Sequence, residues 1–434
     1  MKTLEYWNAD QETIPREYLR ELQLERLRAT VDQALKTPFY KKRLQDVGIT
    51  SGRDLKNHED YKAIPLTRKD DLRQAYPRGL LAVDPAEVIR LHTSSGTTGT
   101  PTVIYHTRRD LENWTELLAR CIIATGARRT DVFQNMMTYG MFTGGLGLHY
   151  GAEKVGMLTI PIGGGNTVRQ LQLMRDFQST ILHITPSYML HIHSAMETEG
   201  YSLADFNLSK VYMGGEPYSE STRRKIEDIY GVEAYNSYGL SEMNGPGVAF
   251  ECEEKQGMHV WEDSFILELL DPESHEPVED GEEGELVMTT LCREATPILR
   301  YRTGDITAIL PGQCPCGRTH RRIERIKGRA DDMLIVNGVN IYPSQIESVL
   351  MKIPEVGTNY QIQIDKKGAI DRLTVKVEIY AKLFSGEARQ LEETRARIRE
   401  RLKGSIVINP VVELHEPGGL PIFEGKAKRV VDNR

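Results

Sequence analysis

Thr93-Ser-Ser-Gly-Thr-Thr-Gly-Thr-Pro-Thr102 is the densest signal in this sequence of 434 residues. It follows an apolar run at Val88–Leu91 that predicts a strand. Glycine lets the backbone fold closely around a ligand, and the amides and hydroxyls of the loop suit phosphate oxygens. It is not a Walker loop, because only two residues separate Gly96 from Gly99 and no lysine follows. A polar surface turn has the same composition, so the loop alone leaves both interpretations open.

Two acidic residues further along the chain complement such a loop. Glu242 lies in Tyr235-Asn-Ser-Tyr-Gly-Leu-Ser-Glu-Met-Asn-Gly245. A carboxylate beside a bound polyphosphate is a natural ligand for Mg²⁺. Asp305 closes Tyr301-Arg-Thr-Gly-Asp305, which we expect to end a strand, and its carboxylate is suited to accept hydrogen bonds from a ribose diol. Taken singly, the glutamate is typical of a solvated turn and the pentapeptide of a turn that closes a strand.

Length and composition limit the class of protein. A chain of 434 residues exceeds the ~250–300 at which one core usually splits, so we expect two or three domains. The sequence is 39% apolar and 27% charged, which is typical of a globular protein. A net charge of −7 offers no electrostatic footprint for nucleic acid or an anionic membrane. With no apolar leader and no apolar run of ~18 residues, a cytoplasmic protein is expected.

The apolar pattern predicts an α/β chain in several parts. Short apolar runs alternate with helical stretches between Val103 and Asn236, which indicates crossover units on a largely parallel sheet. From His259 to Leu310, short strands are separated by acidic turns, as in an antiparallel barrel or sheet. After Lys327 a small α+β domain is expected, so we predict domains at 1–326 and 327–434. Strands are expected at 157–161, 181–184, 210–213, 265–270, 284–288, 306–310, 333–336, 360–364, 373–379 and 411–414, and helices at 15–35, from 343 and at 386–402.

Four residues form a candidate zinc site. Five cysteines are too few for a disulfide framework in a chain of this length. Cys314-Pro-Cys316 is a weak metal signal alone, but Cys252 and His259 flank the same predicted strands. Three cysteines and one histidine are an ordinary tetrahedral set for structural zinc. His320 is an alternative fourth ligand, and two reduced cysteines in a tight turn are the alternative to a metal.

Taken together, the loop, the Glu242 segment and the Asp305 segment resemble the adenylate-forming superfamily of acyl-CoA synthetases, luciferases and adenylation domains. The resemblance continues through 328–338, 342–347 and 424–429, and so spans nearly the whole chain. Within the superfamily it is most similar to the phenylacetate-CoA ligases, on 139–153, 314–320 and 424–432. It implies a large N-terminal domain of mostly parallel sheets with a small β-barrel, and a small mobile α+β C-terminal domain. One departure is Thr100, where many relatives have lysine, which should modestly weaken the contact with pyrophosphate.

The resemblance implies an enzyme that adenylates an aromatic acid similar to phenylacetate and passes the acyl group to coenzyme A. It also implies ATP and Mg²⁺ as cofactors, with Glu242 on the Mg²⁺, and a homodimer. Lys426 is the candidate catalytic lysine, with Lys428 as the substitute, and Asp331 is the candidate hinge. The implied nucleotide-binding residues are Ser94, Ser95, Gly96, Thr97, Thr98, Gly99, Thr100, Gly214, Gly215, Glu216, Pro217, Asn236, Ser237, Tyr238, Gly239, Asp305 and Arg329. The implied acyl pocket is lined by Tyr139, Phe142, Gly144 and Gly145.

Two alternatives remain open at this point. An enzyme that loads an aromatic acid onto a carrier-protein thiol would use the same residues for its first step. A catalytically silent nucleotide-binding scaffold is the other alternative. The presence of Lys426, Glu242 and Asp305 together argues against the scaffold, because a silent protein has no chemical reason to keep all three.

Overall fold

The computed structural model describes residues 5–94, 100–330, 332–367, 370–381, 388–421 and 429–434. The chain divides into two compact units, the first formed by residues 1–163 and 235–325 and the second by 164–234 and 326–434. The chain crosses from the first unit to the second for the last time between residues 325 and 326, at the expected boundary. The division into domains at 1–326 and 327–434 stays a prediction, because residues 164–234 belong to the same compact unit as residues 326–434. In the described part of the chain, no helix is long and apolar enough to cross a membrane.

The helices of the first unit surround its strands. They are α1 (Ala9–Glu12), α2 (Arg16–Ala34), α3 (Pro38–Asp46), α4 (Lys69–Gln74), α5 (Arg108–Ala124) and α6 (Thr143–Val155). Helix α5 begins where the Thr107 side chain accepts from the Asp110 N–H and Asp110 reaches back to Thr107, a capping box that satisfies free N–H groups. Helix α6 ends at Gly156, whose φ of 88° is a left-handed conformation that glycine adopts easily.

The strands of the first unit form three groups. The hairpin of β1 (Arg90–Thr93) and β2 (Val103–His106) holds the glycine-rich loop between its strands. Strands β3 (Val132–Asn135) and β4 (Leu158–Ile160) are parallel. The remaining strands pair antiparallel in the order β10 (Phe265–Leu270), β11 (Glu283–Thr290), β12 (Tyr301–Leu310), β13 (Arg322–Ile323), β9 (Met258–Val260), β8 (Gly245–Glu251) and β7 (Glu233–Leu240). The expected antiparallel region is confirmed, but Tyr301–Asp305 opens β12 instead of ending a strand.

In the second unit, residues 164–234 contain the parallel pair β5 (Ile181–Ile184) and β6 (Lys210–Met213). Helices α7 (Thr167–Asp176), α8 (Pro186–Thr198) and α9 (Glu220–Tyr230) accompany them. We call this part the α7–α9 lobe. Helix α8 starts with Pro186 after Thr185, whose hydroxyl accepts from Tyr188 N–H, the usual order of cap and proline at a helix start.

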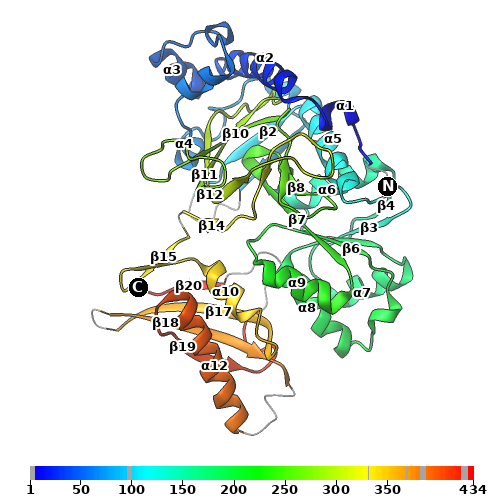
Figure 1. The fold of residues 1–434 in the computed structure, drawn as a ribbon. Coiled ribbons are helices and arrows are strands. Elements are labelled where there is room, and N and C mark those ends of the chain that lie inside the picture. Colours follow the sequence, from blue (N-terminus) through cyan, green and yellow to red (C-terminus); the bar gives the residue numbers. More distant parts are fainter. Residues whose placement is uncertain (1–4, 95–99, 331, 368–369, 382–387, 422–428) are drawn as a thin grey trace. The chain divides into compact units, whose positions relative to one another are not determined.

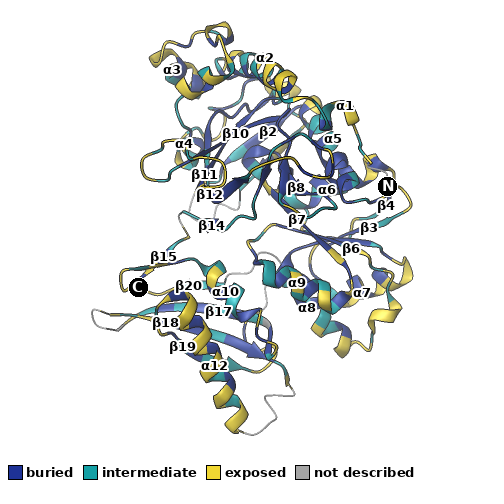
Figure 2. Ribbon diagram, in the orientation of Figure 1, coloured by how far each residue is buried: buried dark blue, intermediate teal, exposed yellow. Residues whose placement is uncertain are grey.

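The second part of this unit, residues 326–434, is the C-terminal segment. It contains β14 (Gly328–Arg329), the hairpin β15 (Leu334–Val336) and β16 (Val339–Ile341), and helix α10 (Pro343–Leu350). Asn337 and Gly338 turn the hairpin with φ of 50° and 81°, as a two-residue turn requires. A sheet follows in the order β19 (Val411–His415), β18 (Ile370–Ile379), β17 (Val356–Lys367) and β20 (Val430–Asp432), covered by α12 (Ala388–Ile406). Figure 2 shows α12 with one exposed and one buried face, and Ile398 and Leu402 lie on the buried one.

Candidate active site and metal centre

The two ends of the glycine-rich loop are tied to each other. The Ser94 N–H donates to the Thr102 carbonyl at 3.1 Å, and the Thr102 N–H donates to the Ser94 hydroxyl at 3.1 Å. The Thr102 hydroxyl donates to Oε1 of Glu242 at 3.2 Å, and both side chains are buried. Residues Ser95–Gly99, predicted to bind phosphate, lie outside the described residues. The loop therefore leaves and re-enters the fold beside the predicted Mg²⁺ ligand.

Arg293 supports the Glu242 segment, and no sequence motif indicated it. Glu242 lies in a short 3₁₀ helix (Ser241–Met243) between β7 and β8. The Arg293 guanidinium donates to the Glu242 carbonyl at 3.1 Å and to the Asn244 side-chain oxygen at 2.7 Å. Burial lowers the pKa of Arg293 to about 10, and it remains a cation at neutral pH. The partners are separated by 51 residues, so only the fold reveals the pair.

The predicted acyl segment adjoins the same region of the first unit. The Met141 carbonyl accepts from the Thr93 N–H at 2.9 Å, and the Thr143 and Ser241 hydroxyls lie 3.2 Å apart. Tyr139 accepts a hydrogen bond from Asn135 at 2.8 Å, and burial raises the pKa of Tyr139 to about 12, so it is neutral.

The glycines of this segment allow close packing of α6. A Cβ on Gly145 would lie 2.8 Å from the Thr138 carbonyl oxygen, so a side chain there would force the backbone to shift. A Cβ on Gly144 would lie 3.5 Å from the Met137 side chain, which is an ordinary contact. Phe142 is 45% exposed. A contribution of these residues to an acyl pocket stays a prediction.

Asp305 and Tyr238, two predicted nucleotide-binding residues, are in direct contact. The Tyr238 hydroxyl donates to the Asp305 carboxylate at 2.5 Å, and both side chains are buried. In the same strand, β7, the Asn236 N–H donates to Glu251, and Ser237 pairs with Phe250 of β8. A Cβ on Gly239 would lie 1.7 Å from the Gly245 carbonyl, so only glycine fits there. The first unit thus brings together Thr102, Glu242 and the acyl segment, and separately Tyr238 with Asp305.

The second unit carries the remaining predicted nucleotide-binding residues. Gly214, Gly215, Glu216 and Pro217 follow β6, and Glu216 accepts a hydrogen bond from the Ser187 N–H at 2.7 Å. Arg329 lies in β14, with its guanidinium 3.8 Å from the Asp332 carboxylate. Asp331, Lys426 and Lys428 lie outside the described residues, so their predicted roles are not tested.

The four candidate zinc ligands converge in the first unit. Cys252, His259, Cys314 and Cys316 are all buried, and one ligand atom from each lies within 4.8 Å of the others. The Cys252 and Cys314 sulfurs are 3.7 Å apart, and the Cys316 sulfur is 3.3 Å from Nε2 of His259. Hydrogen bonds from Cys252 and Cys314 lower the pKa of Cys316, whereas burial raises the pKa of Cys121, a thiol outside the cluster, to about 12. A thiolate that is stabilised in this way is the form that binds metals.

The ring of His259 is oriented by its second nitrogen. Nδ1 lies 3.1 Å from the His320 carbonyl oxygen, which places a proton on Nδ1 and directs Nε2 at the Cys316 sulfur. His320 itself accepts from the Glu262 N–H at 3.0 Å and lies 2.9 Å from the Gln11 carbonyl. Because both ring nitrogens of His320 are engaged, the geometry favours His259 as the fourth ligand.

The loop that carries Cys314 and Cys316 also holds the N-terminal segment. Arg318 forms an ion pair with Glu12 at 2.7 Å, and both side chains are buried. The Thr319 N–H donates to the Glu12 carbonyl at 3.1 Å, and the Tyr6 hydroxyl donates to the Cys316 carbonyl at 3.0 Å. The cluster therefore lies under a strap formed by residues 5–14.

Comparisons with known proteins agree with this arrangement. Residues 24–292 match the family described as AMP-binding enzyme, and residues 338–434 match the AMP-binding enzyme C-terminal domain. The phenylacetate-coenzyme A ligase of Thermus thermophilus is 44% identical over 98% of both chains. That of Pseudomonas putida is 44% identical over 98% of this chain and 96% of its own.

A solved structure is also similar along the whole chain. The 2-hydroxyisobutyryl-CoA ligase in its postadenylation state has a TM-score of 0.93 at 29% identity, over 99% of this chain and 92% of its own. The same ligase in its thioesterification state has a TM-score of 0.73 over the same shares of the two chains.

Proposed function

This chain belongs to the phenylacetate-coenzyme A ligase family of AMP-binding enzymes, and we propose that it joins phenylacetate, or a closely similar aromatic acid, to coenzyme A. It is an AMP-forming acid–thiol ligase that uses ATP and coenzyme A. The observation that carries the choice of acid is the identity of 44% to two phenylacetate-coenzyme A ligases over nearly the full length of both chains. We also propose a cytoplasmic location, because the similar phenylacetate-coenzyme A ligases are bacterial and the ATP and coenzyme A of a bacterium are in its cytoplasm.

The reaction has two steps because a carboxylate is a poor acyl donor. In the first, a carboxylate oxygen attacks the α-phosphorus of ATP, and pyrophosphate leaves with the bonding electron pair. In the second, the sulfur of coenzyme A attacks the acyl carbon, its proton is lost, and AMP leaves. Negative charge gathers between two anionic groups in the first step, so a cation placed there speeds it. We assign that cation to Lys426, with Lys428 as the alternative.

We assign nucleotide binding to the predicted residues as follows. The loop from Ser94 to Thr100 holds the pyrophosphate end through its amides and hydroxyls. The Asp305 carboxylate binds the ribose hydroxyls, oriented by its hydrogen bond from Tyr238 and aided by Arg329. The segment Gly214–Pro217 lies along the adenine. Asp331 serves as the hinge at which the C-terminal segment changes position between the two steps.

Glu242 is suited to hold Mg²⁺. A buried carboxylate oxygen is the donor type that Mg²⁺ prefers, and the ion completes its shell with phosphate oxygens and water. When bound, Mg²⁺ would neutralise charge on the phosphates. Thr102 and Arg293 fix the Glu242 side chain and backbone, which supports a precise position for the carboxylate.

The acid is expected to bind against Tyr139, Phe142, Gly144 and Gly145. Tyr139 is a neutral aromatic wall, and the glycines add no side chain, so a flat slot suits a planar ring better than an alkyl chain. We also propose a homodimer, as is usual in the family, which light scattering of the purified chain would test.

We propose a structural zinc ion in the Cys252, His259, Cys314 and Cys316 cluster. The donor set fits, since three thiols and one oriented imidazole nitrogen converge and are all buried. Zinc there would tie β8 and β9 to the 314–320 loop, and it takes no part in the reaction.

The proposed function is tested by measuring pyrophosphate release with ATP, Mg²⁺ and a panel of aromatic and aliphatic acids. We expect release that depends on phenylacetate and that coenzyme A accelerates. Lys426→Ala should reduce it by ~10²-fold or more, whereas Lys428→Ala should stay close to the wild type, and the reverse result would assign the role to Lys428. If coenzyme A does not change the rate of release, the acceptor is instead a carrier protein. If none of the acids supports pyrophosphate release, the proposal is overturned.

A further inference from the structure

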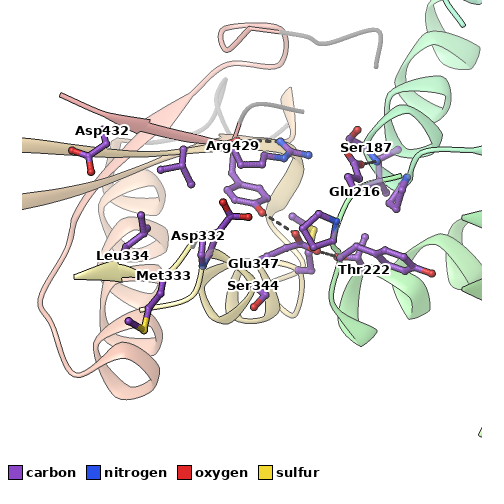
Figure 3. A pocket seen from close by; sticks show the side chains of 18 of the residues that line it. Ser187, Glu216, Thr222, Asp332, Met333, Leu334, Ser344, Glu347, Arg429 and Asp432 are labelled. Atoms are coloured by element: carbon purple, nitrogen blue, oxygen red, sulfur yellow. Dashed lines mark hydrogen bonds between the residues drawn. The ribbon is translucent and has the colours of Figure 1, made fainter. Parts of the chain in front are cut away.

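The carboxylate of Glu347, in α10, is held at the start of helix α9. Its Oε1 accepts from the Ser219 N–H at 2.9 Å and from the Thr222 hydroxyl, and its Oε2 accepts from the Tyr360 hydroxyl at 2.8 Å. Figure 3 shows Glu347 pointing from α10 towards Thr222. N–H groups at the start of a helix lack partners within the helix, and the positive end of the helix dipole favours a carboxylate. A buried side chain of the C-terminal segment thus accepts from the Ser219 N–H and joins the Ser219–Thr222 hydroxyl pair of the α7–α9 lobe.

A second contact leaves the same helix. The Lys225 ammonium donates to the carbonyls of Val356 and Gly357, at 2.7 Å and 3.1 Å, and lies 5.5 Å from the centre of the Tyr380 ring. All three partners belong to the C-terminal segment, whereas Lys225 belongs to the lobe. Helix α9 and its N-cap therefore donate to the C-terminal segment at two places, the Glu347 carboxylate and the backbone carbonyls of 356–357.

The contact at Glu347 continues towards the segment with the predicted catalytic lysine. Tyr360, which donates to Glu347, lies under the Arg429 guanidinium at 4.4 Å from the ring centre. Arg429 also donates to the Tyr360 carbonyl at 3.1 Å, and it follows Lys426 by three positions in the sequence. These residues line a cavity of about 430 Å³ together with Glu216 and Pro217 of the predicted adenine segment.

We propose that Glu347 and Lys225 form a latch that holds the C-terminal segment on the α7–α9 lobe for one of the two half-reactions. The inference rests on the proposed function, in which the C-terminal segment changes position between the steps. The 2-hydroxyisobutyryl-CoA ligase changes its own arrangement between steps, since two of its states match this chain with TM-scores of 0.93 and 0.73. A segment that turns near residue 331 must break both contacts, because each joins the lobe to the segment. Glu347 and Lys225 are therefore positioning residues. The strength of their contacts sets how long the latched arrangement persists.

The test measures the two half-reactions separately in the full-length enzyme. Pyrophosphate release in a single turnover without coenzyme A reports the first, and consumption of purified phenylacetyl-adenylate by coenzyme A reports the second. Glu347→Ala and Lys225→Met should both change the ratio of the two rates, in the same direction, by about fivefold or more. Glu355→Ala is the matched control, because Glu355 pairs with Arg397 inside the C-terminal segment, and its ratio should stay at the wild-type value. Glu347→Gln keeps an acceptor for Ser219 and Thr222 and should restore most of the ratio.

An unchanged ratio in both variants, or shifts in opposite directions, would overturn the latch. If Glu347→Ala fails to fold, Tyr360→Phe removes one hydroxyl and keeps the ring under Arg429, so a shift of the ratio in the same direction is expected there. A failure of the proposed function is distinct, since the wild type would then release no pyrophosphate with any acid. In that case hydrogen exchange of the Ser219 amide tests the latch. The amide should exchange faster in Glu347→Ala than in Glu355→Ala. Equal exchange rates in the two variants would refute the latch.

Discussion

The cysteine and histidine cluster and the Glu242 region both lie in the first unit and both have metal-binding side chains, but they are built differently. The cluster gathers four ligand atoms within 4.8 Å, all buried, a set that would complete the shell of a tetrahedral ion. Glu242 offers one buried carboxylate whose neighbours are a hydroxyl and a guanidinium that does not bind metals. A metal ion whose four coordination positions are all filled by protein side chains stabilises the fold. An ion held by a single protein ligand has its other positions open to substrate oxygens and water. The number of converging ligands is therefore what distinguishes the proposed structural zinc site from the proposed catalytic Mg²⁺ site.

The largest expected effect comes from opening the closed shell. Cys314→Ser removes one thiolate, so bound zinc should be lost and the free energy of unfolding should fall by about 3 kcal/mol or more. Metal analysis and urea unfolding of the purified protein measure both quantities. The matched control is Cys292→Ser, because Cys292 is a partly buried thiol outside the cluster. Zinc content and stability equal to those of the wild type would contradict a structural metal.

The next largest effect is expected at Glu242, the proposed Mg²⁺ ligand. Glu242→Gln keeps the shape and the hydrogen bond from Thr102 but removes the charge that Mg²⁺ requires. Pyrophosphate release should fall by roughly 10²-fold, and half-maximal activity should need more Mg²⁺, while stability stays close to that of the wild type. Stopped assays across a Mg²⁺ series measure this. An unchanged Mg²⁺ requirement would remove Glu242 from the metal site.

The smallest effect concerns the support of Glu242. Thr102→Val removes one hydroxyl and leaves a side chain of similar size. A hydrogen bond to a charged group contributes about 1.5–3 kcal/mol, and Arg293 still holds the backbone, so we expect a loss of about tenfold in the first half-reaction. Thr115→Val is the matched control, because the Thr115 hydroxyl donates to the Leu111 carbonyl within α5 and has no assigned role in the reaction. Equal losses in the two variants would mean that the Thr102 hydroxyl has no special role.

The fold could be predicted from the sequence wherever apolar runs are short and bounded by turns. The runs 181–184, 210–213 and 265–270 are β5, β6 and β10 with the expected bounds, because buried strands need unbroken apolar residues. The Tyr301–Asp305 segment was placed wrongly at the end of a strand. Its glycine and charged residues are typical of a turn, but here its side chains are satisfied by cross-strand partners such as Glu285.

The site was predictable only where few residues of one chemical type exist. Five cysteines leave little choice, so the zinc set could be chosen from the sequence, and its four ligand atoms do converge. Arg293 could not be found, and Thr102, although part of the glycine-rich stretch, gave no sign of its contact with Glu242, because both contacts span a long stretch of chain. The contact of Glu347 with α9 was hidden for the same reason, since its partners Ser219 and Thr222 lie more than a hundred residues earlier.

The strap formed by residues 5–14 has a consequence for the order of folding. Trp7 of the strap donates to Glu116, but Arg318 lies 306 residues after Glu12, so the buried Glu12–Arg318 ion pair waits until that part of the chain has been made. At ~5–20 residues per second, synthesis of that stretch takes roughly 15–60 seconds. The Glu12–Arg318 ion pair, and with it the full attachment of the strap to the cysteine loop, is therefore among the later native contacts to form during synthesis.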